Sequence, residues 1–152
     1  MSAQLDAIVT RLTSDSTLMA SLTGGVHKYN ALPTGLTRDS LPTSAFDTAG
    51  YMKPLALVLS RSENRWGGMY DGKARAKSVR NVVEVYIGKD AGGVATTLDT
   101  AALRVEWLLE GVFVGAGWMK IINRIDDIRF EEMDNAIFYR LDFQTVYNKY
   151  LT

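Results

Sequence analysis

The sequence predicts an α+β protein, with one long helix and an N-terminal helix pair packed on an antiparallel (mixed) sheet of about four or five strands. Apolar residues recur with a helical period at the N-terminus and again near 98–110, and they alternate with a period of two near 136–148. At 152 residues the chain suits one domain, 1–152, with a single core. Two long polar stretches, 33–54 and 61–78, interrupt these patterns and are expected to form loop or hairpin arms.

The first helix is predicted over residues 3–13. Its apolar residues lie at positions i, i+3, i+4 and i+7, which is one stripe of a helix: Leu5, Ile8, Val9 and Leu12. Ser14 or Asp15 is placed to cap a second short helix. Gly24 and Gly25 then end that helix, because glycine readily adopts the left-handed conformation found after a helix.

The next segment, with Val26, Tyr29 and Leu32, is expected to be a return strand or an extended segment that leads to Pro33. From Pro33 to Pro54 the chain has three prolines and two glycines, and its apolar periodicity is lost. Loops of this length are uncommon in compact domains and are usually functional or disordered. Two interpretations stay open: an ordinary surface loop, and an arm that packs on another subunit.

Two strands near 55–60 and 79–88 are predicted to form a long hairpin. Residues 55–59 are apolar on both faces of the pleat, which is typical of a strand inside a sheet. In the second strand Glu84 and Tyr86 alternate with three apolar residues, Val83, Val85 and Ile87. The polar stretch 61–78 is then the tip of this hairpin.

The helix near 98–110 is expected to begin with Thr97 as its cap and to end at Gly111. Asp99 lies in its first turn, where a carboxylate complements the helix dipole. The predicted buried stripe consists of Leu98, Ala101, Ala102, Val105, Leu108 and Leu109, and the residues predicted to face away are Arg104, Glu106 and Glu110.

The last part of the chain is predicted to be a second hairpin. Its strand near 136–148 alternates regularly, whereas its partner, near 119–130, changes phase around Asp126 and Asp127, which predicts a bulge. Residues 132–135 form the connecting turn.

Composition excludes several classes of chemistry. The formal net charge is zero, so no overall field attracts nucleic acid. There is no cysteine, which excludes disulfides and cysteine-based zinc sites. His27 is the one histidine and has no acidic neighbour in sequence to orient it as a base. We therefore expect no enzyme activity, catalytic residue, metal site or cofactor.

No membrane association is expected, because the N-terminus lacks the pattern of a signal peptide and no apolar run approaches the roughly 18 residues of a membrane span.

Charge is segregated along the chain. Residues 61–80 carry six basic and two acidic side chains, whereas residues 126–134 carry five acids and one base. Opposite patches on one subunit suit a head-to-tail contact, which closes into a ring when the rotation allows. The aromatic residues within the basic stretch are of types enriched at interfaces. The candidate interface residues are Arg65, Trp66, Met69, Tyr70, Arg75, Lys77, Asp126, Asp127, Glu131 and Glu132.

The order of these segments resembles the tail-terminator (tail-completion, or head–tail joining) proteins of long-tailed bacteriophages. The resemblance spans nearly the whole chain and is carried by these segments: LDAIVTRLTSDSTLMASLTGGVHKYNALP, PLALVLSR, VVEVYIG, TLDTAALRVEWLLEG and the closing antiparallel pair. It rests on pattern and order rather than on a diagnostic motif. The two polar stretches are longer than expected for the smallest members of the family.

The resemblance implies a non-enzymatic structural protein of the virion, assembled in the host cytoplasm. Such proteins form hexameric rings that cap the tail tube, so the implied partners are further copies of the chain, the tail tube protein and the connector or neck protein of the head. A neighbouring neck or head-closure protein is the alternative within the same particle. Outside that class, two alternatives are a small nucleic-acid-binding module using the basic hairpin and a hydrolase using the carboxylates of the last turn.

Overall fold

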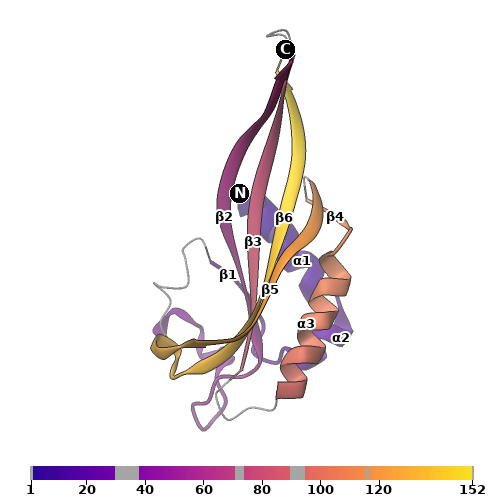
Figure 1. Ribbon diagram of the computed structural model, residues 1–152. Helices are drawn as coiled ribbons and strands as arrows, with labels where there is room; N and C mark the ends of the chain where they lie inside the picture. The colour runs from indigo at the N-terminus through magenta and orange to yellow at the C-terminus, as the bar shows by residue number, and fades with distance from the viewer. Residues whose placement is uncertain (1, 30–37, 71–73, 90–94, 116, 152) are drawn as a thin grey trace.

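The computed structural model describes residues 2–29, 38–70, 74–89, 95–115 and 117–151, with the side chains of 2, 29, 38, 61–70, 74–81, 95–97 and 146–151 left out. It confirms the predicted α+β class. Three helices lie beside a curled sheet of six strands, in the order β1-β2-β3-β6-β5-β4 (Figure 1). The strand count is higher than the expected four or five because two short strands, β1 and β4, join the edges.

Helices α1 (Ser2–Thr13) and α2 (Ser16–Ser21) form the predicted N-terminal pair. Asp15 is the cap of α2, and its carboxylate accepts a hydrogen bond from the Leu18 amide at 3.0 Å. The following glycines are required by close contact. The Gly24 amide donates to the Pro54 carbonyl at 2.7 Å, and a Cβ on Gly24 would lie 2.9 Å from that oxygen. Gly25 has a φ of 89°.

Strand β1 (Val26–Tyr29) pairs with β2 (Leu55–Tyr70) in parallel, and all other pairs in the sheet are antiparallel. Strand β3 (Ala74–Lys89) pairs with β2 along its whole length, with a bulge between Trp66 and Met69. The described part of the polar stretch 61–78 is therefore strand and not loop. Strand β2, predicted to end near residue 60, and strand β3, predicted to begin near residue 79, both extend beyond the apolar segments from which they were predicted.

Helix α3 (Ala95–Leu109) begins two residues before Thr97, so the prediction that Thr97 caps it is wrong. Gly111 ends the helical segment with a φ of 69°, as expected. The chain continues through β4 (Phe113–Val114), β5 (Gly117–Phe130), the 3-10 turn η4 (Glu131–Met133) and β6 (Ala136–Leu151).

The predicted bulge in β5 is present. The register between β5 and β6 shifts between Ile125 and Ile128, and Asp127 there has a φ of 56°. A second shift lies between Ile121 and Asn123. These irregularities bend β5, and its second half curves away from the helix layer (Figure 1).

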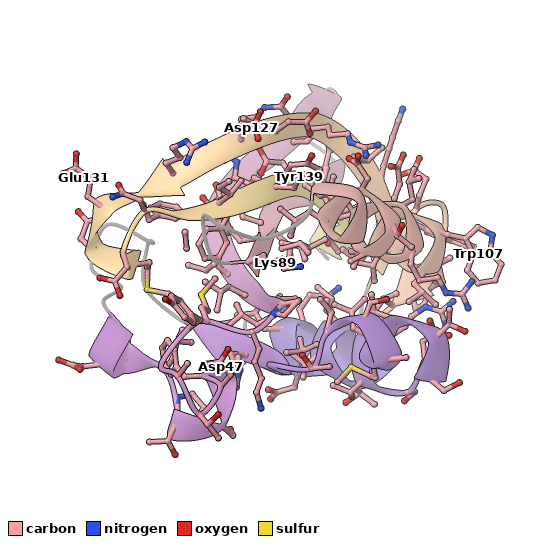
Figure 2. The ribbon with its side chains drawn as sticks, turned by 90° about the horizontal axis from the view of Figure 1, so that it is seen from below. Asp47, Lys89, Trp107, Asp127, Glu131 and Tyr139 are labelled. Atoms are coloured by element: carbon pink, nitrogen blue, oxygen red, sulfur yellow. The ribbon has the colours of Figure 1, made fainter. Side chains whose placement is uncertain are left out.

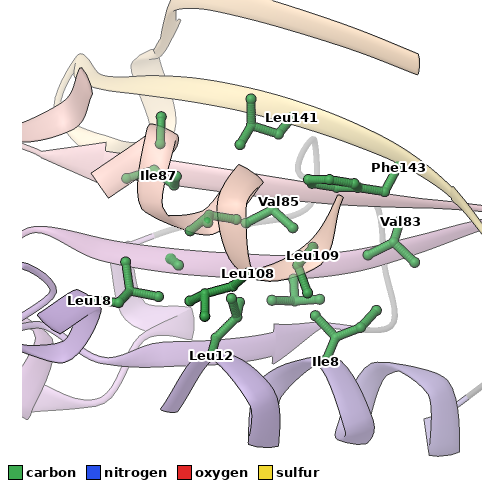
Figure 3. Close-up of a cluster of buried hydrophobic side chains, with 14 of the residues drawn as sticks. Ile8, Leu12, Leu18, Val83, Val85, Ile87, Leu108, Leu109, Leu141 and Phe143 are labelled. Atoms are coloured by element: carbon green, nitrogen blue, oxygen red, sulfur yellow. The ribbon is translucent and has the colours of Figure 1, made fainter. Parts of the chain in front are cut away.

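One face of the sheet packs on the helices (Figure 3). The alternation in β3 puts Val83, Val85 and Ile87 on this face, as predicted. The helical stripes cover them, and all six predicted α3 positions are buried there. The buried hydrophobic residues of the helices in this core are Leu5, Ile8, Leu12, Leu18, Leu98, Ala101, Ala102, Val105, Leu108 and Leu109, and Leu22, the C-cap of α2, joins them.

The opposite face has a second core. Leu55, Leu57, Leu59, Tyr86 and Phe138 contribute from the strands. Irregular chain covers them: Leu41, Ala45 and Met52 come from the segment that contains 3-10 turns η2 (Arg38–Ser40) and η3 (Thr43–Ala45), and Met133 comes from η4. Residues 38–54 of the expected arm 33–54 thus pack on their own sheet. A contact of this arm with a neighbouring subunit stays a prediction.

Candidate assembly surfaces

The basic candidates lie on the upper parts of β2 and β3. In register, Arg65 is opposite Ser78, Trp66 is opposite Lys77, and Met69 is opposite Arg75. Tyr70 is the last residue of β2. We call residues 61–70 and 74–80 the hairpin arm.

The acidic candidates lie at the other end of the sheet. Asp126 and Asp127 are exposed at the β5 bulge, and Glu131 and Glu132 are exposed on η4. Arg124 is the nearby cation, with its Nε 3.9 Å from Asp126 Oδ1. Figure 1 shows the β5–β6 turn and the tip of the β2–β3 hairpin at opposite ends of the sheet. The fold thus separates the two charged groups within one subunit, and a contact between them across copies stays a prediction.

Both edges of the sheet have long uncovered stretches among the described residues. Strand β1 pairs only with residues Ala56 to Leu59 of β2, which leaves the outer edge of β2 without a strand neighbour from Ser60 onward. Strand β4 pairs only with Gly117 and Trp118 of β5. Exposed strand edges are sites where further strands can pair.

Just beyond the β4 pairing, the edge of β5 is hydrogen-bonded to the segment that follows α3. The Met119 amide donates to the Val112 carbonyl, and the Glu110 carboxylate accepts from the Ile121 amide. The open part of this edge therefore begins near Ile122.

The outer side of α3 is a surface that the sequence prediction missed. Leu103 and Trp107 are 56% and 68% exposed, although both are large and apolar. With Glu106 and Glu110 they line a shallow hollow of about 420 Å³. Trp107 points outward from the helix in Figure 2. The signal was present in the sequence, because the predicted stripe and the predicted polar face of this helix both omit these two apolar residues.

Arg104 links this surface to the body of the protein. Its guanidinium donates from Nε and Nη2 to the Asp15 carboxylate at 2.7 and 2.8 Å, and its Cζ lies 4.5 Å from the centre of the Trp107 ring. The hydrogen bonds from Arg104 lower the pKa of Asp15. Trp107 is therefore packed against a fixed cation, which also stabilises the indole ring.

A polar cluster lies on the loop-covered face of the sheet. Glu84 and Asp142 are directly opposite each other in register and are 2% and 3% exposed. The Tyr86 hydroxyl donates to Glu84 Oε2 at 3.1 Å, and Arg140 Nε lies 2.9 Å from Asp142 Oδ1. Burial, and after it the charge of Glu84, raises the pKa of Tyr86 to about 12. Arg140 Nη2 donates to Asp142 Oδ2 at 3.1 Å, whereas Arg140 Nε and Asp142 Oδ1 make no hydrogen bond among the described residues, so the ion pair offsets only part of the cost of burying these charges.

The single histidine is used for packing. His27 Nε2 lies 2.7 Å from the Gly24 carbonyl oxygen, at the tight crossing between α2 and the sheet. Across the described residues, no group of three histidine, cysteine, aspartate or glutamate side chains is arranged to hold a metal ion. Within the same part of the chain, no helix is long and apolar enough to cross a membrane.

Comparison with solved structures finds several similar chains. No protein-family model matches the chain, and no curated protein matches it by sequence. A chain from a solved structure described as the virion of a native gene transfer agent (GTA) particle has the same fold, with a TM-score of 0.56. The two chains are 20% identical, and the match covers 97% of this chain and 96% of that chain. At this level of identity the likeness establishes the fold.

Proposed function

We propose that this chain is a non-enzymatic structural protein of a tailed-phage virion: a tail terminator whose ring, most simply a hexamer, caps the tail tube and joins it to the head connector. One observation carries the proposal. A chain of a GTA virion shares this fold over nearly the full length of both chains. The order of the sequence segments supports the same class independently, because it resembles the tail-terminator family.

The strand directions support a ring. The two open edges belong to β2 and β5. Three antiparallel pairings separate these strands, namely β2 with β3, β3 with β6, and β6 with β5, so β2 and β5 run in opposite directions. The β5 edge of one copy would therefore meet the β2 edge of the next in antiparallel orientation. Each copy offers one edge of each kind, so the contact is heterologous and repeats until it closes.

The separation of charge supports two unlike ends. A ring that caps a tube needs one end for the tube and another for the connector, and the hairpin arm and the β5–β6 turn differ in the sign of their charge. The tail tube protein, the connector or neck protein and further copies of this chain are the proposed partners. A position in the neck as a head-closure protein uses the same features and is the second candidate.

The experiment is a measurement of particle mass and shape. The purified chain is studied by light scattering and negative-stain electron microscopy over a range of protein concentrations. We expect a species of about six times the 16.8 kDa chain mass, seen as rings with a central opening. Addition of purified tail tubes should then place rings at one end of each tube. A chain that stays monomeric at all concentrations, with or without tubes, contradicts the proposal.

A terminator and a head-closure protein differ in the partner they bind first. A terminator ring binds tail tubes that carry no head, whereas a head-closure protein binds filled heads that carry no tail. Sedimentation of the purified ring with each particle separates these two roles.

A further inference from the structure

The outer side of α3 continues into the acidic bulge of β5. Asp99 on α3 and Asp126 and Asp127 on β5 are exposed. Tyr139 lies between the two elements (Figure 2), and its pKa is raised first by its own burial and then by the charges of these three aspartates. Arg124 of β5 forms an ion pair with Glu106 of α3, with 3.2 Å between Nη1 and Oε2. We call this continuous area the α3 surface; its apolar residues are Leu103 and Trp107, and its acidic residues are Asp99, Glu106, Glu110, Asp126 and Asp127.

The α3 surface has excess negative charge. With Asp15, the partner of Arg104, six carboxylates face two guanidiniums, Arg104 and Arg124, so four negative charges are in excess. Arg104 is already bound to Asp15 by two hydrogen bonds and Arg124 to Glu106. Exposed apolar side chains surrounded by charged groups mark protein interaction sites. A suitable occupant is therefore basic and carries aromatic or apolar side chains of its own.

The hairpin arm has this composition. Its two strands carry five basic residues and one acid, a balance of four positive charges, together with Trp66, Met69 and Tyr70. Aromatic residues, methionine and arginine are the types enriched at the centre of protein interfaces. An arginine of the arm that reaches the α3 surface would also find the exposed face of the Trp107 ring.

The two surfaces lie on opposite flanks of the subunit. Helix α3 packs against β3, β5 and β6, whereas β2, which forms the outer edge of the hairpin arm, lies on the flank that packs against α1 and β1. A contact between them is heterologous and can be repeated around a ring. We infer that the α3 surface binds the hairpin arm of the neighbouring copy, so that the aromatic residues of the arm enter the hollow beside Trp107. This inference rests on the proposed ring and names one of its contacts.

The chain has no cysteine, so introduced cysteines can be crosslinked without background. The test variant combines Leu103→Cys with Tyr70→Cys, and the matched control combines Tyr51→Cys with Tyr70→Cys, because Tyr51 is 60% exposed and Leu103 is 56% exposed. Each variant is treated with a short bismaleimide. We expect the test variant to give a ladder of covalent oligomers on a denaturing gel, ending at the number of subunits in the ring. The control should give little beyond monomer.

The particle mass is measured on the same untreated samples. Rings without a ladder from the test variant overturn the α3–arm contact and leave the proposed ring standing. Equal ladders from the test and control variants also overturn the contact. A monomer in solution with no ladder overturns both the contact and the ring.

A second pair of variants tests the chemistry of the contact. Trp107→Lys places a positive charge in the hollow and should weaken self-association at least tenfold, whereas Trp107→Phe keeps an aromatic ring and should change it less than threefold. Circular dichroism of both variants should match wild type, since Trp107 is exposed. Equal self-association of wild type and Trp107→Lys overturns the inference.

Discussion

The two faces of the sheet are buried by different kinds of chain. Three amphipathic helices cover the face that carries Val83 and Val85, whereas 3-10 turns and loop cover the face that carries Leu57 and Phe138. Ten buried hydrophobic residues of the helices anchor the first cover. The segment from 38 to 54 contributes three buried residues to the second. The helix layer is therefore the stronger part, and the loop cover is the part most free to relax.

The largest expected effect compares two phenylalanines. Phe143 on the helix-covered face and Phe138 on the loop-covered face are both fully buried. We expect Phe143→Ala to lower the free energy of unfolding by about 3–5 kcal/mol, and Phe138→Ala to cost toward the lower end of that range, because the loop cover can collapse into the cavity. Urea unfolding measures both. A larger loss for Phe138→Ala would contradict the difference between the two faces.

Packing against Gly88 gives the next effect. Gly88 is directly opposite Phe138 in register, and a Cβ added to Gly88 would lie 2.2 Å from the Phe138 ring. We expect Gly88→Ala to cost about 1–3 kcal/mol, because the ring must move. Gly111→Ala is the control, since its Cβ would meet nothing within 4 Å and only its φ of 69° is strained. Combining Phe138→Leu with Gly88→Ala should recover part of the stability lost by Gly88→Ala, whereas combining it with Gly111→Ala should recover none. If the losses from Gly88→Ala and Phe138→Leu simply add, the added Cβ does not clash with the ring.

The polar cluster predicts a pH dependence. Because the folded state raises the pKa of Tyr86 from 10.0 to about 12, the unfolded state loses this proton first as pH rises. The stabilisation is fully present below pH 10 and is lost between about 10 and 12, a change of roughly 2–3 kcal/mol. Thermal melts across this range measure it. Tyr86→Phe should be less stable than wild type at neutral pH and should flatten the alkaline decline; an unchanged decline would contradict the assignment to Tyr86.

A smaller effect on stability is expected from Asp15, whose ion pair with Arg104 connects α2 to α3. Asp15→Asn should still cap α2, because asparagine is a good cap residue, but it removes the ion pair with Arg104. Since Arg104 lowers the pKa of Asp15, the stabilisation is present at neutral pH and disappears as pH falls below the ordinary value of 3.8. We expect a slightly lower Tm for Asp15→Asn at pH 7 and no difference at the lowest pH values. Asp15→Ala, which also loses the cap, should be less stable at both.

The smallest effect on folding is expected on the outer side of the helix layer. Trp107→Ala removes an exposed side chain and its stacking on Arg104, so the free energy of unfolding should fall by less than about 1 kcal/mol. Chemical denaturation at low protein concentration is the measurement. A larger loss would mean that Trp107 belongs to the core and not to an interaction surface.

Regular patterns made the helix-covered face predictable from the sequence. The α1 and α3 stripes and the alternation of β3 and β6 each identify the residues that meet in that core. The cover of the second face was not predictable, because Leu41, Ala45 and Met52 follow no period and each lies in a turn-rich stretch. The same applies to β2 beyond residue 60, where polar residues hide a strand that backbone pairing with β3 maintains.

The candidate surfaces were predicted in part. The charged segments were evident from composition, and the structure adds that they lie at opposite ends of the sheet. The exposed pair Leu103 and Trp107 lies off the apolar stripe of α3, and helical periodicity identifies only the stripe that faces the core, so it does not predict this pair as a surface.

The last strand has a practical consequence for work on this protein. Leu151 pairs with Arg75, so β6 ends beside the tip of the β2–β3 hairpin, at the end of the sheet marked C in Figure 1. An affinity tag or fluorescent label fused after β6 would emerge next to the hairpin arm and would compete for whatever docks there.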